Sequence, residues 1–286
     1  MSSKTLSSKA LPYLLLLPAT LFLLVFFVYP FVQVVADAFT LGGAPSLGNF
    51  QNMLGNWKFP GALQNTLLLT VIVVPLQLVM SLVMSSVVMR LKTARNTILY
   101  IFTIPLGLSD LAAGIIWLAI FEQSGFLNSA LVGLHITDQP ILFLGYAGGW
   151  MIFAAVIFAE LWRASAIMMV ILVAGMGLIP KEYYEAAEVF GATPWKRFTK
   201  VTLPLLRPSL QTALILRTIN AFEVFAVVMA LAGSNMPMLM SETYQWQFSL
   251  HDSGVAACYA IVILAISVLA TLVYLRALRV PKGAGL

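Results

Sequence analysis

The stretch LQNTLLLTVIVVPLQLVMSLVMSSVVM, residues 63–89, contains no aspartate, glutamate, lysine or arginine. A helix needs about 20 mostly apolar residues to cross the hydrocarbon core of a bilayer, and this stretch exceeds that length. Its apolar residues do not alternate with a period of two, which excludes a strand of a membrane β-barrel. The stretch therefore predicts a transmembrane α-helix.

The whole chain has the composition of a membrane protein. Its 286 residues are 60% hydrophobic and 9% charged, whereas a soluble domain is roughly 45–50% apolar and about 25% charged. The net charge is +5, but the basic residues are scattered between apolar runs, which does not indicate nucleic-acid binding. A single cysteine, Cys258, excludes a disulfide framework and a cysteine-based metal site. A soluble enzyme is improbable on these grounds.

Five further apolar runs are long enough to span a membrane. With the first, the expected spans are residues 11–35, 63–89, 97–121, 146–176, 209–231 and 256–277. We expect an all-α integral membrane protein with six transmembrane helices, forming one transmembrane domain over residues 1–286. Pro75, Pro105 and Gly107 are expected to kink their helices.

The basic residues predict the orientation, because cytoplasmic segments carry an excess of Lys and Arg. If both termini are cytoplasmic, 13 of the 16 basic residues lie in inner segments: Lys4, Lys9, Arg90, Lys92, Arg95, Lys181, Lys196, Arg197, Lys200, Arg207, Arg276, Arg279 and Lys282. Only Lys58 lies in an outer segment, and Arg163 and Arg217 fall within spans. We therefore predict cytoplasmic termini on both ends of a six-span chain.

The inner loop between the fourth and fifth spans, residues 177–208, is too long for a turn and rich in helix signals. Pro180 suits a first helical turn, and Glu182 complements the helix dipole there. Gly191 is a natural stop for that helix, because glycine accepts the left-handed conformation. Thr193 followed by Pro194 reads as the N-cap and first residue of a second short helix.

One face of the first loop helix collects Tyr183, Ala186, Ala187 and Phe190 by helical spacing. Such a face can lie on lipid headgroups, pack beneath its own helix bundle or bind a cytoplasmic partner. Periodicity favours the first two uses and does not decide between the three.

The exact residues of this loop carry more information than their periodicity. Glu185-Ala186-Ala187, then Gly191-Ala192, then Leu203-Pro204 and Pro208 resembles the EAA loop of binding-protein-dependent ABC importer permeases. The resemblance implies a coupling helix that docks into a cleft on an ATP-binding subunit. The residues it assigns to coupling are Tyr183, Glu185, Ala186, Ala187, Phe190, Gly191 and Ala192. Phe190 departs from the family pattern, which often has aspartate directly before the glycine.

The chain has no phosphate loop of the G-x-x-x-x-G-K-[ST] type. If the resemblance holds, ATP and Mg²⁺ are bound by separate partner ATPase subunits, and this chain is a non-catalytic transport subunit with no cofactor of its own. The histidines, His135 and His251, lie in different outer loops with no evident third ligand, so no metal site is expected.

Five ionisable residues fall within the spans, where charges are costly and mark a pathway, a polar pair or a cavity. They are Asp110, Glu160, Arg163, Arg217 and Glu223. Glu160 and Arg163 are three residues apart on one helix and can pair. Arg217 and Glu223 lie on different faces of their helix, so each needs another partner or water. A structural ion pair and a substrate pathway both remain open.

A second resemblance concerns the substrate. Ile104-Pro105, Phe121-Glu122-Gln123-Ser124-Gly125, Trp162-Arg163 and the run from Arg217 to Glu223 are similar to maltose- and trehalose-type permeases. That family's sugar-contacting positions fall here on Arg163, Ala164, Ile167, Ile219, Asn220 and Glu223, with Trp162 beside them. Arg163, Ala164 and Ile167 differ from the maltose permease's own residues, and Glu223 replaces an amide, so the position of the site carries over while its selectivity does not.

The resemblance implies a permease of an ATP-driven importer that moves a di- or oligosaccharide, such as trehalose or maltose, by alternating access. The implied partners are a second six-span permease, two ATP-binding subunits and an extracytoplasmic sugar-binding protein, in a prokaryotic cytoplasmic membrane. Two alternatives stay open: a permease for another solute, such as glycerol phosphate or a polyamine, and an ATP-independent secondary transporter or channel. An intramembrane enzyme has no supporting serine–histidine or paired-aspartate arrangement within the spans.

Overall fold

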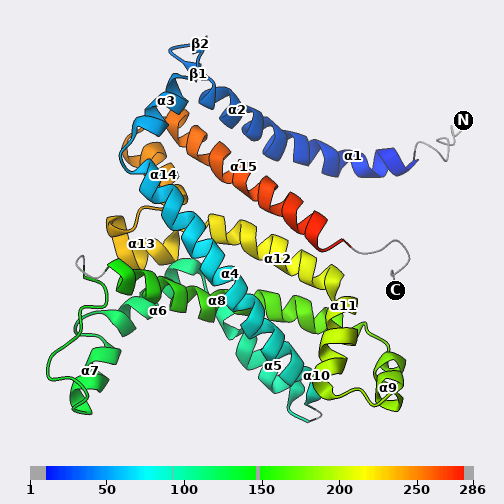
Figure 1. Ribbon diagram of the computed structural model, residues 1–286. Coiled ribbons are helices and arrows are strands. Elements are labelled where there is room, and N and C mark those ends of the chain that lie inside the picture. The colour runs from blue at the N-terminus through cyan, green and yellow to red at the C-terminus, as the bar shows by residue number, and fades with distance from the viewer. Residues whose placement is uncertain (1–10, 92, 146–148, 280–286) are drawn as a thin grey trace, which may run out of the picture. The chain divides into compact units, whose positions relative to one another are not determined.

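The computed structural model describes residues 11–91, 93–145 and 149–279, and most of them are helical (Figure 1). The chain forms two compact units. Unit 1 comprises Met1–Trp57 and Thr243–Ile261, and unit 2 comprises Lys58–Glu242 and Val262–Leu286. Helices α14 (Leu239–Tyr244) and α15 (Ser253–Ala277) contribute residues to both.

Among the described residues, five helical segments are long and apolar enough to cross a membrane: Leu11–Ala38, Phe59–Arg90, Asp110–Gly133, Gly149–Gly177 and Ser253–Ala277. A sixth candidate is the pair Arg207–Phe222 and Ala226–Asn235, which is bent by 47° at a short break. The predicted all-α membrane class is confirmed, with five spans or up to six. The orientation stays a prediction, and four of its basic residues, Lys4, Lys9, Lys92 and Lys282, lie outside the described residues.

Unit 1 begins with one long helical segment made of α1 (Leu11–Leu23), the π-turn η1 (Leu24–Val28) and α2 (Tyr29–Ala38). A two-stranded antiparallel ribbon, β1 (Thr40–Leu41) and β2 (Ala44–Pro45), leads to α3 (Gly48–Gly55). The Asn49 amide is buried and donates to the carbonyls of Asp37 at 2.9 Å and Thr40 at 3.0 Å. The π-turn η6 (Gln245–Ser249) leads toward α15.

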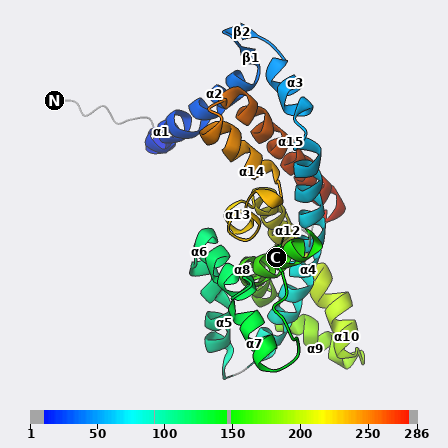
Figure 2. The ribbon, with the colours of Figure 1, turned by 90° about the vertical axis from the view of Figure 1, so that its left-hand side faces the viewer.

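Unit 2 holds the remaining elements. They are α4 (Phe59–Arg90), α5 (Arg95–Thr103), the 3-10 turn η2 (Ile104–Gly107), α6 (Asp110–Phe121), α7 (Phe126–Gly133), α8 (Gly149–Gly177), α9 (Lys181–Val189), α10 (Pro194–Arg197), the π-turn η4 (Phe198–Thr202), α11 (Leu203–Leu205), α12 (Arg207–Phe222), α13 (Ala226–Ala232) and the 3-10 turn η5 (Gly233–Asn235). Helix α8 packs against both α4 and α12, and α6 packs against α13 (Figures 1 and 2).

The structure differs from the expected continuous span over residues 97–121. The chain is helical on both sides of Ile104–Gly107 but breaks there, so that the candidate span runs over Asp110–Gly133 instead. Pro105 cannot donate a backbone hydrogen bond, and after the 3-10 turn at Ile104–Gly107 the backbone is extended at Leu108 and Ser109, where the helix is interrupted. Ser109 then restarts the helix by accepting a hydrogen bond from the Ala112 backbone nitrogen at 3.2 Å. Pro75, by contrast, lies inside α4.

A stripe of polar residues joins α4 to α8. Gln77, Ser81 and Ser85 follow one another at intervals of four and are all buried. They donate to backbone carbonyls of α8: Gln77 to Glu160 at 2.7 Å, Ser81 to Ser165 at 3.0 Å and Ser85 to Met169 at 3.3 Å. Hydrogen bonds between membrane helices supply attraction where the apolar surroundings supply none, so this stripe fixes the register of the two helices.

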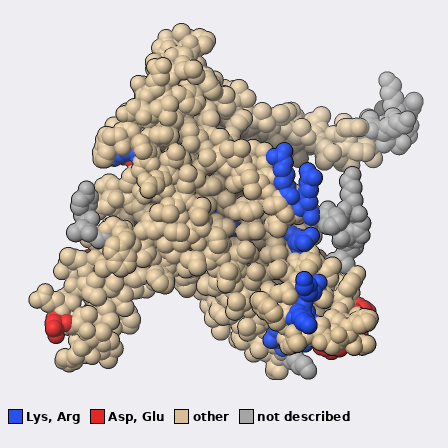
Figure 3. Space-filling view, in the orientation of Figure 1, with Lys and Arg blue, Asp and Glu red and all other residues tan. Residues whose placement is uncertain are grey.

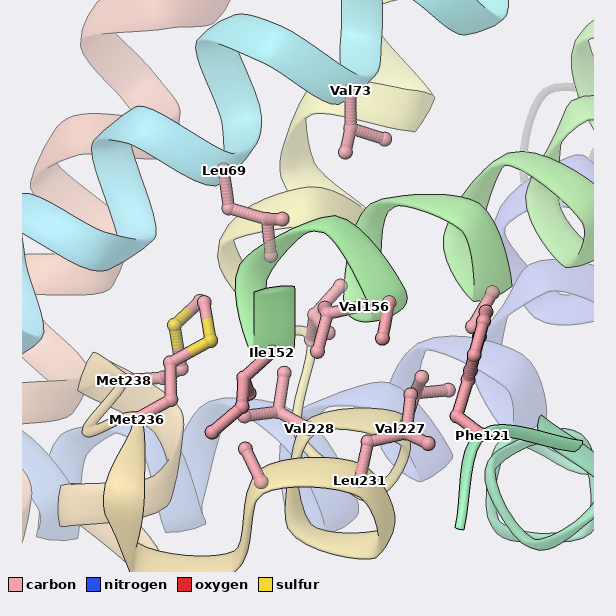
Figure 4. Packing of buried hydrophobic residues seen from close by; sticks show 14 residues of the cluster. Leu69, Val73, Phe121, Ile152, Val156, Val227, Val228, Leu231, Met236 and Met238 are labelled. Carbon is pink, nitrogen blue, oxygen red and sulfur yellow. The ribbon is translucent and has the colours of Figure 1, made fainter. Parts of the chain in front are cut away.

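One cluster of buried apolar side chains is built from α4, α6, α8 and α13. Leu69 and Val73 of α4 pack beside Ile152 and Val156 of α8, with Val227 of α13 among the other members of the cluster (Figure 4). Along α8, the cluster lies before Glu160 and Arg163, and the α9–α11 loop follows them. The cluster packs α8 against α4 and α6.

The closest approach between α8 and α12 depends on Gly175. An alanine Cβ there would lie 2.6 Å from the Ser209 Cβ and 2.9 Å from a Leu206 methyl carbon. We expect Gly175→Ala to destabilise the purified protein by about 1–3 kcal/mol in detergent thermal unfolding, because the helices must separate. Ser209→Gly in the same chain is expected to restore part of the loss.

The matched control is Gly177→Ala, since nothing lies within 4 Å of a Cβ at the last residue of the same helix. Equal melting temperatures for Gly175→Ala and Gly177→Ala would show that the two helices do not approach as described.

Candidate functional site

The centre of unit 2 holds a buried ion pair between helices α8 and α12. Arg217 is 1% exposed and Glu160 is fully buried. The Arg217 Nη2 donates to Glu160 Oε2 at 2.7 Å, and its Nε donates to the Gln77 side-chain oxygen. Glu160 therefore balances the Arg217 charge. The Gln77 side chain links both helices, because its oxygen accepts from Arg217 of α12 and its nitrogen donates to the Glu160 backbone carbonyl of α8.

A second arginine extends this cluster. The Arg163 Nη2 lies 3.2 Å from Glu160 Oε1, and its Nη1 lies 2.6 Å from Asp110 Oδ1. Asp110 is the first residue of α6, so the network joins α4, α6, α8 and α12. Two carboxylates and two guanidinium groups cancel in charge, which lowers the cost of holding them within the spans. We call Gln77, Asp110, Glu160, Arg163 and Arg217 the charge network.

The predicted pairing of Glu160 with Arg163 is confirmed. The partners of Arg217, which the sequence left open, are Glu160 and Gln77. Sequence reasoning missed Gln77 and the pairing of Asp110 with Arg163. A usable signal existed, since Gln77 is a large polar residue in a run without charges, but spacing along one helix cannot tell which other helix lies beside it.

The predicted sugar residues of α12 lie where this helix ends. Asn220 and Glu223 are exposed, Ile219 is half-buried, and the chain bends at Glu223 before α13 begins. Asn220 and Glu223 continue an exposed stripe of α12 that starts at Thr212 and Leu216. Their side chains form no hydrogen bond or ion pair with the described residues, and are free to bind a ligand.

The predicted residues of α8 have different surroundings. Ala164 is buried, while Trp162, Arg163 and Ile167 are half-buried. Arg163 is committed to the charge network, so its charge already has two carboxylate partners. The network connects this set to α12 through Glu160 and Arg217. The assignment of these residues to a sugar stays a prediction.

An aromatic pocket of about 450 Å³ lies beside this set. Its walls include Trp117, Phe121, Phe143 and Trp150. The Trp117 ring packs edge-on against Trp162 at 6.0 Å and stacks with Phe121 at 5.3 Å. Sequence reasoning singled out only Trp162. Trp117, Phe121 and Phe143 come from other segments, and Trp150 lies about three turns earlier in α8.

The loop after α8 forms the two helices that the sequence predicted. Helix α9 ends before Gly191, whose φ of +68° is the left-handed conformation expected of a helix stop. Thr193 caps α10 by accepting from the Lys196 backbone nitrogen at 3.4 Å, and Pro194 is its first residue. Pro180 precedes α9 instead of lying within its first turn.

The predicted face of α9 is turned outward. Of its four residues, Tyr183 and Ala186 are exposed, Ala187 is half-buried and Phe190 is 89% exposed. The neighbouring Glu185 is also exposed, and Val189 is 85% exposed. On the other side, the loop is held together by an ion pair between Glu188 and Arg197 and by a hydrogen bond from Thr202 to the Tyr184 hydroxyl at 3.3 Å. Large exposed apolar side chains of this kind mark an interaction surface. The coupling role of these residues stays a prediction.

The amino-acid sequence is similar to those of known transport proteins. Residues 77–278 match the family described as binding-protein-dependent transport system inner membrane component. The chain is 31% identical over 294 residues to the arabinooligosaccharides transport system permease protein AraP of Bacillus subtilis (strain 168), covering 98% of this chain and 92% of the relative. It is 28% identical over 280 residues to the trehalose/maltose transport system permease protein MalF of Thermococcus litoralis, covering 93% and 92%.

The fold is also that of a solved transporter. A chain of a bacterial alginate ABC transporter, solved in complex with an alginate pentasaccharide-bound periplasmic protein, superimposes with a TM-score of 0.81. The match covers 96% of each chain at 19% sequence identity, which shows a shared fold. The family match includes α8, the loop of α9 to α11 and α12, and so spans the charge network and the exposed α9 face. The chain therefore belongs to the binding-protein-dependent transport system inner membrane components, a family of transport permeases.

Proposed function

We propose that the chain is the permease subunit of an ATP-driven ABC importer that carries a di- or oligosaccharide by alternating access. The observation that carries this proposal is the outward apolar face of α9, with Phe190 at 89% exposure, in a chain whose relatives include permeases named for arabinooligosaccharides and trehalose/maltose. A surface of that kind fits a cleft on a separate ATP-binding subunit, which binds ATP and Mg²⁺.

The distribution of charge supports an orientation in which this loop is cytoplasmic. Lys and Arg side chains gather over the loop and the neighbouring start of α12 (Figure 3). Exposed residues there include Lys196, Lys200 and Arg207. With six spans and this loop in the cytoplasm, the positive-inside rule supports the proposal that both termini are cytoplasmic.

The substrate path is proposed to pass the C-terminal end of α12, at Asn220 and Glu223, and not the first turns of its exposed stripe. Asn220 and Glu223 offer an amide and a carboxylate at a helix break, and broken helices near the membrane midplane frame substrate sites in transporters. Trp162 and the rings near it offer aromatic faces, as a sugar site requires. A second six-span permease on this face would close the path, and an extracytoplasmic binding protein would deliver the sugar.

Two observations favour a sugar over an anionic solute such as glycerol phosphate. Arg163 and Arg217 are each paired with a carboxylate, so neither supplies a net positive site. Glu223, the exposed ionisable residue of the proposed path, is an acid and would repel a phosphate.

The test is uptake in proteoliposomes that hold the chain with its partner subunits. Uptake of a labelled oligosaccharide is expected only with ATP on the side of the ATP-binding subunits, whereas a secondary transporter would work with an ion gradient alone. Glu223→Gln and Asn220→Ala are each expected to raise the half-saturating sugar concentration roughly tenfold, the value of one hydrogen bond to a charged or polar partner.

Thr212→Ala is the matched control, because Thr212 lies on the same exposed stripe two turns away and bonds only its own helix, at the Pro208 carbonyl. If Glu223→Gln and Asn220→Ala transport like Thr212→Ala and the unmodified chain, the end of α12 does not carry the sugar.

A further inference from the structure

A second cavity, of about 650 Å³, lies between the end of α4, the start of α5, the end of α8 and the α9–α10 loop. Four of its lining residues are basic: Arg90, Arg95, Lys181 and Arg197. None of its lining residues is acidic. The sugar path and the outward face of α9 do not use this cavity, so its charge needs another explanation.

The cations of this cavity are poorly balanced by the described protein. Arg197 pairs with Glu188, but no described carboxylate forms an ion pair with Arg90, Arg95 or Lys181. The Arg95 Nε is buried and has no hydrogen-bond partner, while its Nη2 reaches only the Met89 sulfur at 3.3 Å. A buried guanidinium nitrogen without an acceptor is costly, and a bound anion would supply that acceptor.

The position of the cavity indicates where such an anion comes from. Arg90 is the last residue of α4 and Gly177 is the last residue of α8, and both helices are candidate membrane spans. The cavity therefore lies at the depth where a membrane-spanning helix meets the lipid headgroups. Its remaining wall includes Met89, Met176 and Ile179, which suit the apolar part of a lipid.

We propose that this cavity binds the phosphate of an anionic phospholipid headgroup, held by Arg90, Arg95 and Lys181. Arginine forms paired hydrogen bonds to phosphate, and basic residues near an anionic leaflet are attracted to its headgroups. Because Tyr184 and Arg197 of the α9–α10 loop share the cavity, an occupant joins this loop to the ends of α4 and α8. The proposal concerns lipid binding and does not depend on which solute is carried.

The test uses the full-length chain, purified in mild detergent with the subunits that accompany it, and native mass spectrometry of retained lipid. Phosphatidylglycerol is expected to remain bound in preference to phosphatidylcholine. Arg90→Gln combined with Arg95→Gln is expected to reduce that retention roughly tenfold or more. Arg276→Gln combined with Arg279→Gln removes two exposed basic residues outside the cavity lining and is expected to retain the lipid.

A titration of phosphatidylglycerol into the unmodified protein covers the case in which the double variant does not fold. Saturable binding with no matching effect of phosphatidylcholine supports the proposal. Equal retention of both lipids, or equal losses in the two double variants, overturns it. Displacement by free glycerol phosphate with no retained lipid overturns the lipid assignment and identifies a soluble phosphate ester as the ligand.

Discussion

Replacing Arg217 with methionine is expected to remove most of the folded protein from the membrane. The substitution leaves Glu160 fully buried with one guanidinium shared with Asp110, and leaves the Gln77 oxygen without its donor. The charge network then has a net charge of −1 within the spans. Breaking one partner of a buried ion pair costs about 3–5 kcal/mol, which is a large part of the stability of most proteins. The measurement is the amount of folded protein extracted from membranes and its melting temperature in detergent.

The remainder of the charge network provides a rescue. Adding Glu160→Gln to Arg217→Met removes the unpaired charge, and Arg163 keeps its carboxylate partner Asp110 at 2.6 Å. The double variant is expected to recover at least half of the lost stability, because replacing both ions is far less costly than removing one. A double variant less stable than Arg217→Met would contradict the pairing.

Arg163→Gln is the matched control, since it removes the same kind of charge from the same network. The Arg163 side chain is 17% exposed and that of Arg217 is 1% exposed. Partial contact with solvent lowers the penalty on the carboxylates it leaves behind, so a smaller loss is expected. Equal losses for Arg163→Gln and Arg217→Met would show that burial does not set the cost.

Replacing Val189 and Phe190 together with serine is expected to release the ATP-binding subunits from the purified complex. The two side chains are 85% and 89% exposed in the chain, so the substitutions remove no packing within it. Burying each in a partner contributes about 1.5–3 kcal/mol, so losing both weakens binding by a hundredfold or more. The measurement is the ATP-binding subunit retained on the tagged permease, together with ATP-driven uptake.

Phe126→Ser is the control for that experiment. Phe126 is 75% exposed on α7 and lies outside the α9–α11 loop. It is expected to leave subunit retention unchanged. If the Val189 and Phe190 variant retains its ATP-binding subunits as well as Phe126→Ser does, the exposed α9 face lies on lipid headgroups and the coupling role is lost.

Local features of this protein were predictable from the sequence. The apolar runs identify the membrane-spanning helices, because a bilayer demands a minimum apolar length whatever the fold. Gly191 and the pair Thr193-Pro194 predict the ends of the loop helices, since capping depends on neighbouring residues alone. The break at Pro105 was expected only as a kink, because the sequence does not show how completely the surrounding helices replace the lost hydrogen bond.

The sequence by itself determined the class, most of the spans and the place of the loop in the chain, all of which depend on residues close together in the chain. The third span was displaced, from residues 97–121 to Asp110–Gly133. Only the tertiary structure decided which charges meet. Arg217 is 57 residues from Glu160 and 140 from Gln77, and Asp110 is 53 from Arg163. A buried charge such as that of Arg217 is stable only beside a counter-ion, but the sequence offers several acids that could serve as that counter-ion. The packing of α4, α6, α8 and α12 decides which acid lies beside which arginine. The register and crossing geometry of these helices are set by side chains along all four of them.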